Sequence, residues 1–113
     1  MRDYKLYLYD IKGAIEKIEV FTKDLTFEEF VQDVKTVDAV VRNLEVLGEA
    51  SKHIPKRIKK KHSEIDWKAI MGMRNIIAHE YFGVRLEIVW KTVRKRLPEL
   101  RDKIEEILKE GKK

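Results

Sequence analysis

Apolar residues recur every three or four positions along most of this 113-residue chain, and that spacing restricts what the chain can fold into. Residues repeating at that interval stay on one side of an α-helix, which has 3.6 residues per turn. Only two prolines and five glycines interrupt the pattern. It predicts a single all-α domain over residues 1–113, an up-and-down bundle of four to five helices. The stripe of the first helix, expected over residues 3–22, consists of Tyr4, Leu8, Ile11, Ile15, Ile18 and Phe21.

A second helix is expected from Thr26 to about His53. Thr26 and Glu29 have the spacing of a capping box, in which each side chain binds the other residue's backbone N–H. From Val37 onward a second face is apolar as well, which indicates two neighbours. This helix is therefore either the centre of a monomer or part of an interface between two copies. The inner stripe contains Phe27, Phe30, Val34, Val37, Val41 and Leu44, and the second face adds Val40, Val46 and Ala50.

Pro55 ends the second helix or opens a short next one. Ser63 or Asp66 can cap a third helix that starts near Trp67 and has Gly83 as its natural stop.

A fourth helix is expected to begin near Arg85. Pro98 breaks or kinks it, and residues 98–110 continue as helix. Trp67 and Trp90 fit apolar stripes and are interpreted as core residues.

Composition excludes several classes of protein. The absence of cysteine excludes disulfide frameworks, thiol catalysis and cysteine-based zinc sites. No apolar run approaches the roughly 18 residues that a membrane span needs. Residues 1–9 contain charged side chains among the apolar ones, so they do not resemble a signal peptide, and we expect a cytoplasmic protein.

Charge is distributed unevenly along the chain. Residues 1–50 carry a net charge of −4, whereas residues 51–113 carry +9. A polyanion would therefore meet the second half. Two groups of cations there are interpreted either as solvated side chains, with the first group in a loop, or as a rim that binds RNA phosphates. The first is Lys56, Arg57, Lys59, Lys60 and Lys61, and the second is Arg94, Lys95, Arg96 and Arg101.

The other histidines do not indicate a metal site. His53 and His62 are nine positions apart and have no acidic partner at the spacing of metal ligands. We therefore expect no metal and no cofactor.

The segment from Arg74 to Tyr81 concentrates the groups that can do chemistry. Asn75 and His79 are four positions apart and lie on one face of a helix. Arg74 and His79 are five apart, about 140° around an ideal helix, so they converge only under special conditions. Convergence requires one of three arrangements. Either the helix ends near His79, or the long arginine side chain reaches around the helix, or two copies of the segment face each other.

Arginine and histidine together could cleave RNA without a metal. Arginine offers a planar set of donors to phosphate oxygens, and histidine exchanges protons near neutral pH. RNA cleavage needs a base for the ribose 2′-OH, an acid for the leaving 5′-oxygen and a cation for the phosphorane. Structural interpretations also stand at this point. Arg74 could form an ion pair, His79 could stabilise a helix C-terminus, and Tyr81 could lie at the edge of the core.

The motif Arg74-x4-His79-x-Tyr81 resembles the Arg-x4–6-His-x-Tyr motif of the HEPN superfamily, in its HepT-like branch. The segments RNLEVLGEASKHIP (42–55), IDWKAIMGMRNIIAHEYFGV (65–84) and VWKTVRKRLPEL (89–100) are similar to that branch in order and spacing. The resemblance implies a helical-bundle ribonuclease that is the toxin of a toxin–antitoxin pair. Its catalytic pair would be Arg74 and His79, with Asn75 as the polar residue that follows the arginine.

The resemblance also implies partners. The antitoxin would be a separately encoded minimal nucleotidyltransferase that silences the toxin by transferring AMP to Tyr81. Members pair as homodimers with their motifs facing a shared cleft, and we expect a homodimer here too. Gly48 would let a neighbouring helix approach, and Glu49 could orient a motif residue. The alternative from another class is a non-catalytic module that binds a nucleotide or substrate for a partner nucleotidyltransferase.

Overall fold

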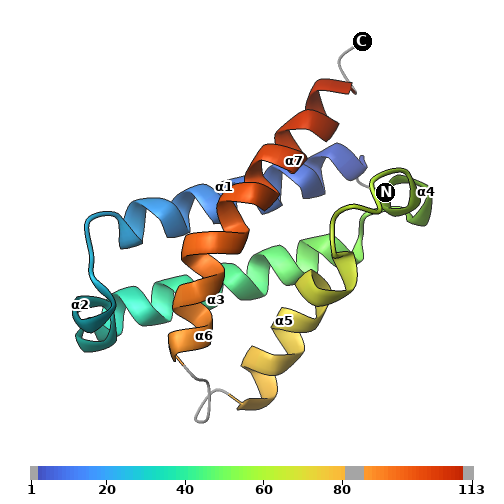
Figure 1. The fold of residues 1–113 in the computed structure, drawn as a ribbon. Helices are drawn as coiled ribbons and strands as arrows, with labels where there is room; N and C mark the ends of the chain where they lie inside the picture. The colour runs from blue at the N-terminus through green and yellow to red at the C-terminus, as the bar shows by residue number, and fades with distance from the viewer. Residues whose placement is uncertain (1–2, 81–85, 111–113) are drawn as a thin grey trace.

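The computed structural model describes residues 3–80 and 86–110, and for residues 74–80 it describes the backbone alone. Throughout these ranges the ordered elements are helices, so the predicted all-α bundle is confirmed (Figure 1). The long segments are α1 (Tyr4–Thr22), α3 (Val34–Lys52), α5 (Trp67–Glu80) and a continuous run of α6 (Leu86–Lys91), η2 (Thr92–Arg96) and α7 (Leu97–Glu110). The short helices are α2 (Phe27–Gln32) and α4 (Lys56–Lys61).

Helix α3 lies at the centre of the arrangement. It runs antiparallel to α1 on one side and packs against α5 on another, while α7 crosses α1 (Figure 1). The two apolar faces of α3 are therefore both covered within one copy of the chain, as in the monomer interpretation. Homodimerisation remains a prediction, because this packing does not require a second copy.

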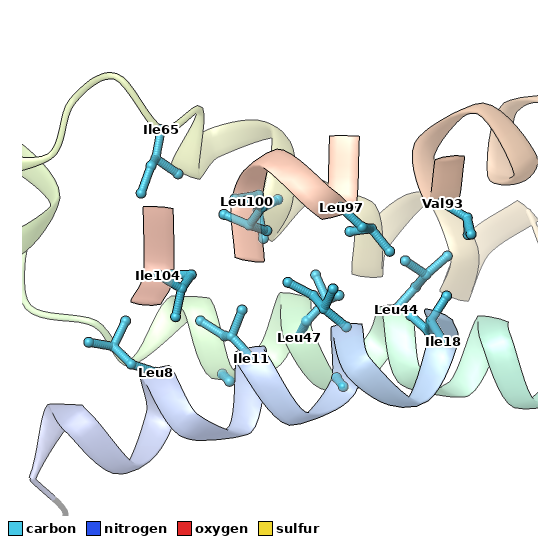
Figure 2. Close-up of a cluster of buried hydrophobic side chains, with 14 of the residues drawn as sticks. Leu8, Ile11, Ile18, Leu44, Leu47, Ile65, Val93, Leu97, Leu100 and Ile104 are labelled. Atoms are coloured by element: carbon cyan, nitrogen blue, oxygen red, sulfur yellow. The ribbon is translucent and has the colours of Figure 1, made fainter. Parts of the chain in front are cut away.

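The core is formed by aliphatic side chains of α1 and α3 that meet those of η2 and α7 (Figure 2). The side chains of Ile11, Leu47 and Ile104 are completely buried there. The labelled residues of this cluster are Leu8, Ile11, Ile18, Leu44, Leu47, Ile65, Val93, Leu97, Leu100 and Ile104.

The capping box at the start of α2 is confirmed. The Thr26 N–H donates to the Glu29 carboxylate at 2.9 Å, and the Glu29 N–H donates to the Thr26 hydroxyl at 3.1 Å. Each side chain thus satisfies a backbone donor that the first turn of a helix leaves unpaired.

The prediction of one continuous helix from Thr26 to His53 is wrong, because the helix is interrupted at Asp33. The Asp33 backbone leaves the helical region (φ −100°, ψ 85°), and its carboxylate accepts from the N–H and hydroxyl of Thr36 at 3.1 and 2.7 Å. These hydrogen bonds favour the ionised form and lower the pKa of Asp33. Aspartate competes with helical backbone bonding in this way and so starts a new helix. Val34 follows the break and is 69% exposed, not part of the inner stripe.

Two predicted helix starts are confirmed. Pro55 directly precedes α4, so it opens a short helix. The Asp66 carboxylate accepts from the Ala69 N–H at 3.0 Å, so Asp66 caps α5. The predicted boundaries at Gly83 and Arg85 lie outside the described residues.

Pro98 does not break the last helical run, and the predicted continuation of the helix over residues 98–110 is confirmed. The segment before it, η2, is π-helical, and the N–H of Leu97 donates to the carbonyl of Thr92, five residues back. A proline inside an α-helix loses one hydrogen bond and its ring collides with the preceding turn. The wider π turn accommodates Pro98, so the chain stays helical to Glu110.

Because the helix is interrupted at Asp33, we expect substitutions of two valines of α3 to change the free energy of unfolding by different amounts. Val41→Ala removes two methyl groups from a side chain that is 4% exposed, and should lower the free energy of unfolding by about 2 kcal/mol. Val34→Ala, at the exposed start of the helix, should change it by less than about 0.5 kcal/mol. Urea unfolding followed by circular dichroism measures both. Equal losses would mean that Val34 belongs to the core.

Candidate functional site

Helix α5 carries the residues of the predicted site, and its first residue, Trp67, is buried and hydrogen-bonded. The Trp67 indole N–H donates to the carbonyl of His62 at 3.1 Å, and Trp67 is only 6% exposed. Ile70, one turn later, is also buried. The expectation that Trp67 is a core residue is confirmed, and its hydrogen bond fixes the junction between α4 and α5.

The motif residues occupy the second half of α5. The described helix continues to Glu80, so the backbones of Arg74, Asn75 and His79 belong to one α-helical segment. Asn75 and His79 therefore lie on one face, and Arg74 lies about 140° from His79 around the axis. The side chains of residues 74–80, and Tyr81 entirely, lie outside what the structure describes. Their chemical roles stay predictions.

The basic cluster of residues 56–61 is a helix and not a loop, so that part of the prediction is wrong. Pro55 starts α4, and the burial of Ile58 anchors the helix to the core. The charged side chains consequently spread around the helix and have different surroundings. Lys61 pairs with Glu110 at 3.4 Å, and the Arg57 guanidinium lies 5.3 Å from the centre of the Tyr4 ring.

Lys59 is the member of the cluster that reaches α5. Its ammonium contacts the Met71 sulfur at 3.3 Å, one turn before Arg74. Partial burial lowers the pKa of Lys59, and the nearby charge of Lys56 lowers it further. Lys56 and Lys60 are exposed. They remain candidates for phosphate contacts, together with the other three.

Two arginines of the second basic group have structural partners. The Arg94 guanidinium donates to the carbonyls of Thr22 and Leu25, each at 2.8 Å, and lies 4.3 Å from the Trp90 ring centre. It therefore caps the C-terminal end of α1. Arg101 pairs with Glu19, and this hydrogen-bonded carboxylate raises the pKa of Arg101.

The interpretation of Trp90 as a core residue is only partly confirmed. Trp90 is half-buried and packs against Phe30, with ring centres 4.9 Å apart. It also contacts the Phe27 ring, with centres 6.2 Å apart, and the Arg94 guanidinium, so the ring lies at the edge of the core.

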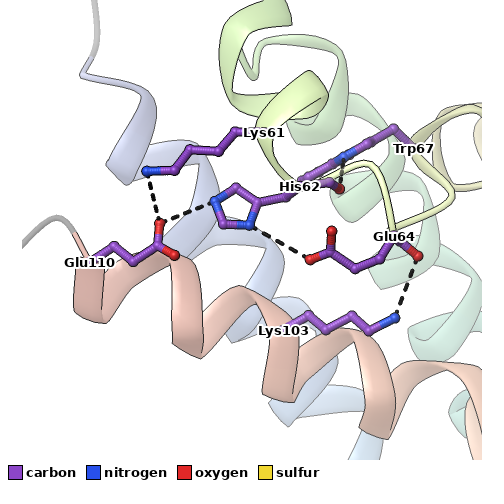
Figure 3. A network of polar contacts seen from close by, with 6 residues as sticks. All are labelled: Lys61, His62, Glu64, Trp67, Lys103 and Glu110. Atoms are coloured by element: carbon purple, nitrogen blue, oxygen red, sulfur yellow. Dashed lines mark hydrogen bonds and ion pairs between the residues drawn. The ribbon is translucent and has the colours of Figure 1, made fainter.

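Sequence reasoning missed the role of His62, which it considered only as a metal ligand. His62 is 8% exposed and lies between two carboxylates (Figure 3). Its Nε2 is 3.1 Å from Glu110 and its Nδ1 is 3.6 Å from Glu64. The Lys103 ammonium donates to the Glu64 carbonyl at 3.4 Å. Glu110 is 48 residues from His62, so no local spacing could have indicated this junction.

His53 and Glu49 lie near each other at the end of α3. His53 Nε2 is 4.0 Å from the Glu49 carboxylate, which is also 3.7 Å from the Lys52 ammonium. The His53 ring stacks on Tyr7 with centres 4.7 Å apart. A role of Glu49 toward the motif stays a prediction, as does the role of Gly48, which is buried in α3.

A hollow of about 280 Å³ separates α5 from η2 and α7. Apolar, cationic and acidic side chains all line it. Residues of α5 that line it are Ala69, Ile70 and Met73, and residues of η2 and α7 are Arg96, Leu97, Glu99, Leu100 and Lys103.

Within residues 3–80 and 86–110, leaving aside the side chains of 74–80, no three acidic or histidine side chains are grouped to hold a metal ion. None of the described helices is both long and apolar enough to cross a membrane.

The chain belongs to the ribonuclease HepT-like family, whose pattern matches residues 11–107. It is 48% identical over 108 residues to "Probable ribonuclease HepT" of Thermococcus cleftensis, covering 96% of this chain and 98% of that protein. A "Putative RNase" of Caldanaerobacter subterraneus is 43% identical over 99% of this chain and its own full length. One of Methanocaldococcus jannaschii is 44% identical over 96% of this chain and 94% of its own length. No solved structure gave a significant match.

Proposed function

We propose that this protein is a metal-independent endoribonuclease whose catalytic pair is Arg74 and His79. The observation that carries the proposal is membership in the HepT-like ribonuclease family over residues 11–107, which include both residues. Because the two residues lie about 140° apart on the described helix, convergence on one phosphate would use the long arginine side chain or the facing motifs of two copies.

The chemistry uses the ribose 2′-OH as the nucleophile. His79 accepts the 2′-OH proton while the 2′-oxygen attacks phosphorus and the bond to the 5′-oxygen breaks. The leaving 5′-oxygen takes a proton, and Arg74 stabilises the negative charge of the phosphorane. The 5′ fragment ends in a 2′,3′-cyclic phosphate. A base and an acid are both needed, so a second His79 or Tyr81 would supply the second group.

RNA cleavage should survive EDTA and stop when the ribose at the cut site is 2′-deoxy. His79→Ala should slow cleavage by at least the 10²–10⁴-fold that is typical of one general acid–base group. Arg74→Ala should also slow it strongly, because a phosphorane without a cation is poorly stabilised. Digestion of a labelled single-stranded RNA, with and without EDTA or a 2′-deoxy substitution, by the purified wild type and variants measures all four effects.

His53→Ala is the matched control, since it removes an imidazole that lies outside the motif. It should cut like the wild type. Dependence on added Mg²⁺, or cutting of an all-DNA strand, would contradict the mechanism. Intact RNA together with measurable nucleotide binding would favour the non-catalytic module.

A homodimer is the second part of the proposal. Facing motifs would provide one histidine as base and another as acid, which a single helix does not do easily. Sedimentation equilibrium at micromolar concentration should give twice the 13.5 kDa mass of the chain. A mass of one chain at that concentration, with RNA cleavage retained, would refute the dimer.

The third part is the biological role as a toxin, silenced by a minimal nucleotidyltransferase that transfers AMP to Tyr81. Tyr81 is seven positions from Arg74, two helical turns if the helix continued. An AMP group there would place a negative phosphodiester where an RNA phosphate would otherwise meet Arg74. It would also repel the incoming RNA backbone.

Incubation with the cognate nucleotidyltransferase and ATP should add the mass of AMP at Tyr81 and stop RNA cleavage. Tyr81→Phe should escape this silencing, because it has no hydroxyl to modify, and it should still cut RNA if a second His79 supplies the acid. Loss of cleavage would mean that Tyr81 takes part in catalysis or folding. Mass spectrometry and the cleavage assay measure the two effects. An active Tyr81→Phe that is still silenced would mean that the antitoxin only masks the site.

A further inference from the structure

The helical run that follows the motif carries three exposed cations, Lys91, Lys95 and Arg96. We call these three residues the α6–η2 ridge. Lys91 and Lys95 are four positions apart, so they lie on one side of the run and their charges repel. Within the described part of the chain, none of the three forms an ion pair, although the acidic residues Glu87 and Glu99 lie one turn away.

The neighbouring Arg94 differs from the ridge residues, because its charged group has partners within the fold. Its guanidinium donates to two backbone carbonyls and lies over the Trp90 ring. The buried Val93 directs one side of η2 into the core. The ridge is the remaining, solvent-facing part of the same basic segment, and the fold itself makes no described use of its charges.

The ridge leads toward the motif helix. Arg96 and Met73 line the same hollow between η2 and α5, and Met73 immediately precedes Arg74. The described end of α5 at Glu80 and the start of α6 at Leu86 are also only six positions apart. A chain of phosphates that contacts the ridge would therefore reach the part of α5 that carries the motif.

The other basic group is less suited to this task. Three of its five cations are already engaged, with Glu110, the Tyr4 ring and the Met71 sulfur. Lys56 and Lys60 line a second hollow, which shares Glu64, Ile65 and Asp66 with the hollow that Arg96 lines and lies beside Trp67, at the start of α5. That position is about 18 Å along the helix axis from His79, at 1.5 Å per residue.

We infer that the α6–η2 ridge binds the sugar–phosphate backbone of single-stranded RNA and leads it to the motif on α5. The inference rests on the proposed ribonuclease function. Lysine and arginine side chains contact phosphates without reading the bases, and each contact releases a counterion. Binding through the ridge is therefore independent of sequence and sensitive to salt.

The test replaces Lys91, Lys95 and Arg96 together by glutamine. The probe is a fluorescent, fully 2′-O-methylated oligouridine of about 20 nucleotides, which cannot be cleaved through its 2′-oxygen. At 0.1 M salt the triple variant should bind about 10–100-fold more weakly than the wild type. The slope of log K against log salt should become shallower by about 2, because each lost phosphate contact on a single strand contributes about 0.7.

A matched triple variant, Lys17→Gln, Lys23→Gln and Lys109→Gln, removes the same charge from exposed positions elsewhere. It should bind the probe nearly as well as the wild type. Equal weakening by both triple variants would mean a general effect of net charge and would overturn the inference. A larger loss from the double variant Lys56→Gln and Lys60→Gln would overturn it in favour of α4. Circular dichroism melting verifies that each variant is folded.

Cleavage of ordinary RNA separates this inference from the proposed function. The ridge variant should show a raised KM and a nearly unchanged kcat, because the motif residues are intact. If the wild type cuts RNA but the ridge variant binds the probe as well as the wild type does, the ridge does not bind the RNA backbone. The inference is then wrong, and the proposed nuclease function is unaffected. If the wild type neither binds the probe nor cuts RNA, both the function and the inference are wrong.

Discussion

The packing of α3 between α1 and α5 holds the rest of the structure in place. Leu44 and Leu47 are almost completely removed from water on this helix, and burying one such side chain contributes roughly 1.5–3 kcal/mol. Among the described elements, α3 is the main neighbour of α5. The orientation of the motif helix is therefore set by α3, together with the hydrogen bond from Trp67 to the end of α4.

The sequence predicted the features of the fold that depend on local spacing. The stripe of α1 and the capping box at Thr26 follow from residues within one or two turns of each other. The break at Asp33 was missed because the valines on both sides keep the helical period across it. Asp33 breaks the helix through hydrogen bonds to Thr36, which apolar periodicity does not reveal. Pro98 pointed to an irregularity, but the spacing did not distinguish a kink from a π turn.

The candidate catalytic pair is predicted from the resemblance of the motif to a known family, because the types and spacing of Arg74 and His79 alone also fit structural roles. The charges indicate the site only in part. The use of each cation depends on partners that are distant in the chain. Arg94 binds carbonyls 69 and 72 residues away, and Arg101 binds a carboxylate 82 residues away. In the sequence, Arg94 and its neighbours Lys95 and Arg96 look alike, and only the fold separates the structural cation from the exposed ones.

The π-helical segment also gives the chain one residue more than an α-helix would need between α6 and α7. Val89, Val93 and Leu97 follow each other at intervals of four, and in a pure α-helix each step would rotate the buried side by about 40°. The wider turn absorbs this rotation, so α6 and α7 both keep their apolar sides toward the core. Loss of one residue between Thr92 and Arg96 would convert η2 to α-helix without rotating its flanks, but it would place Pro98 inside a regular α-helix, where its ring collides with the preceding turn. The extra residue of η2 therefore keeps the core in register and lets the helix pass through a proline.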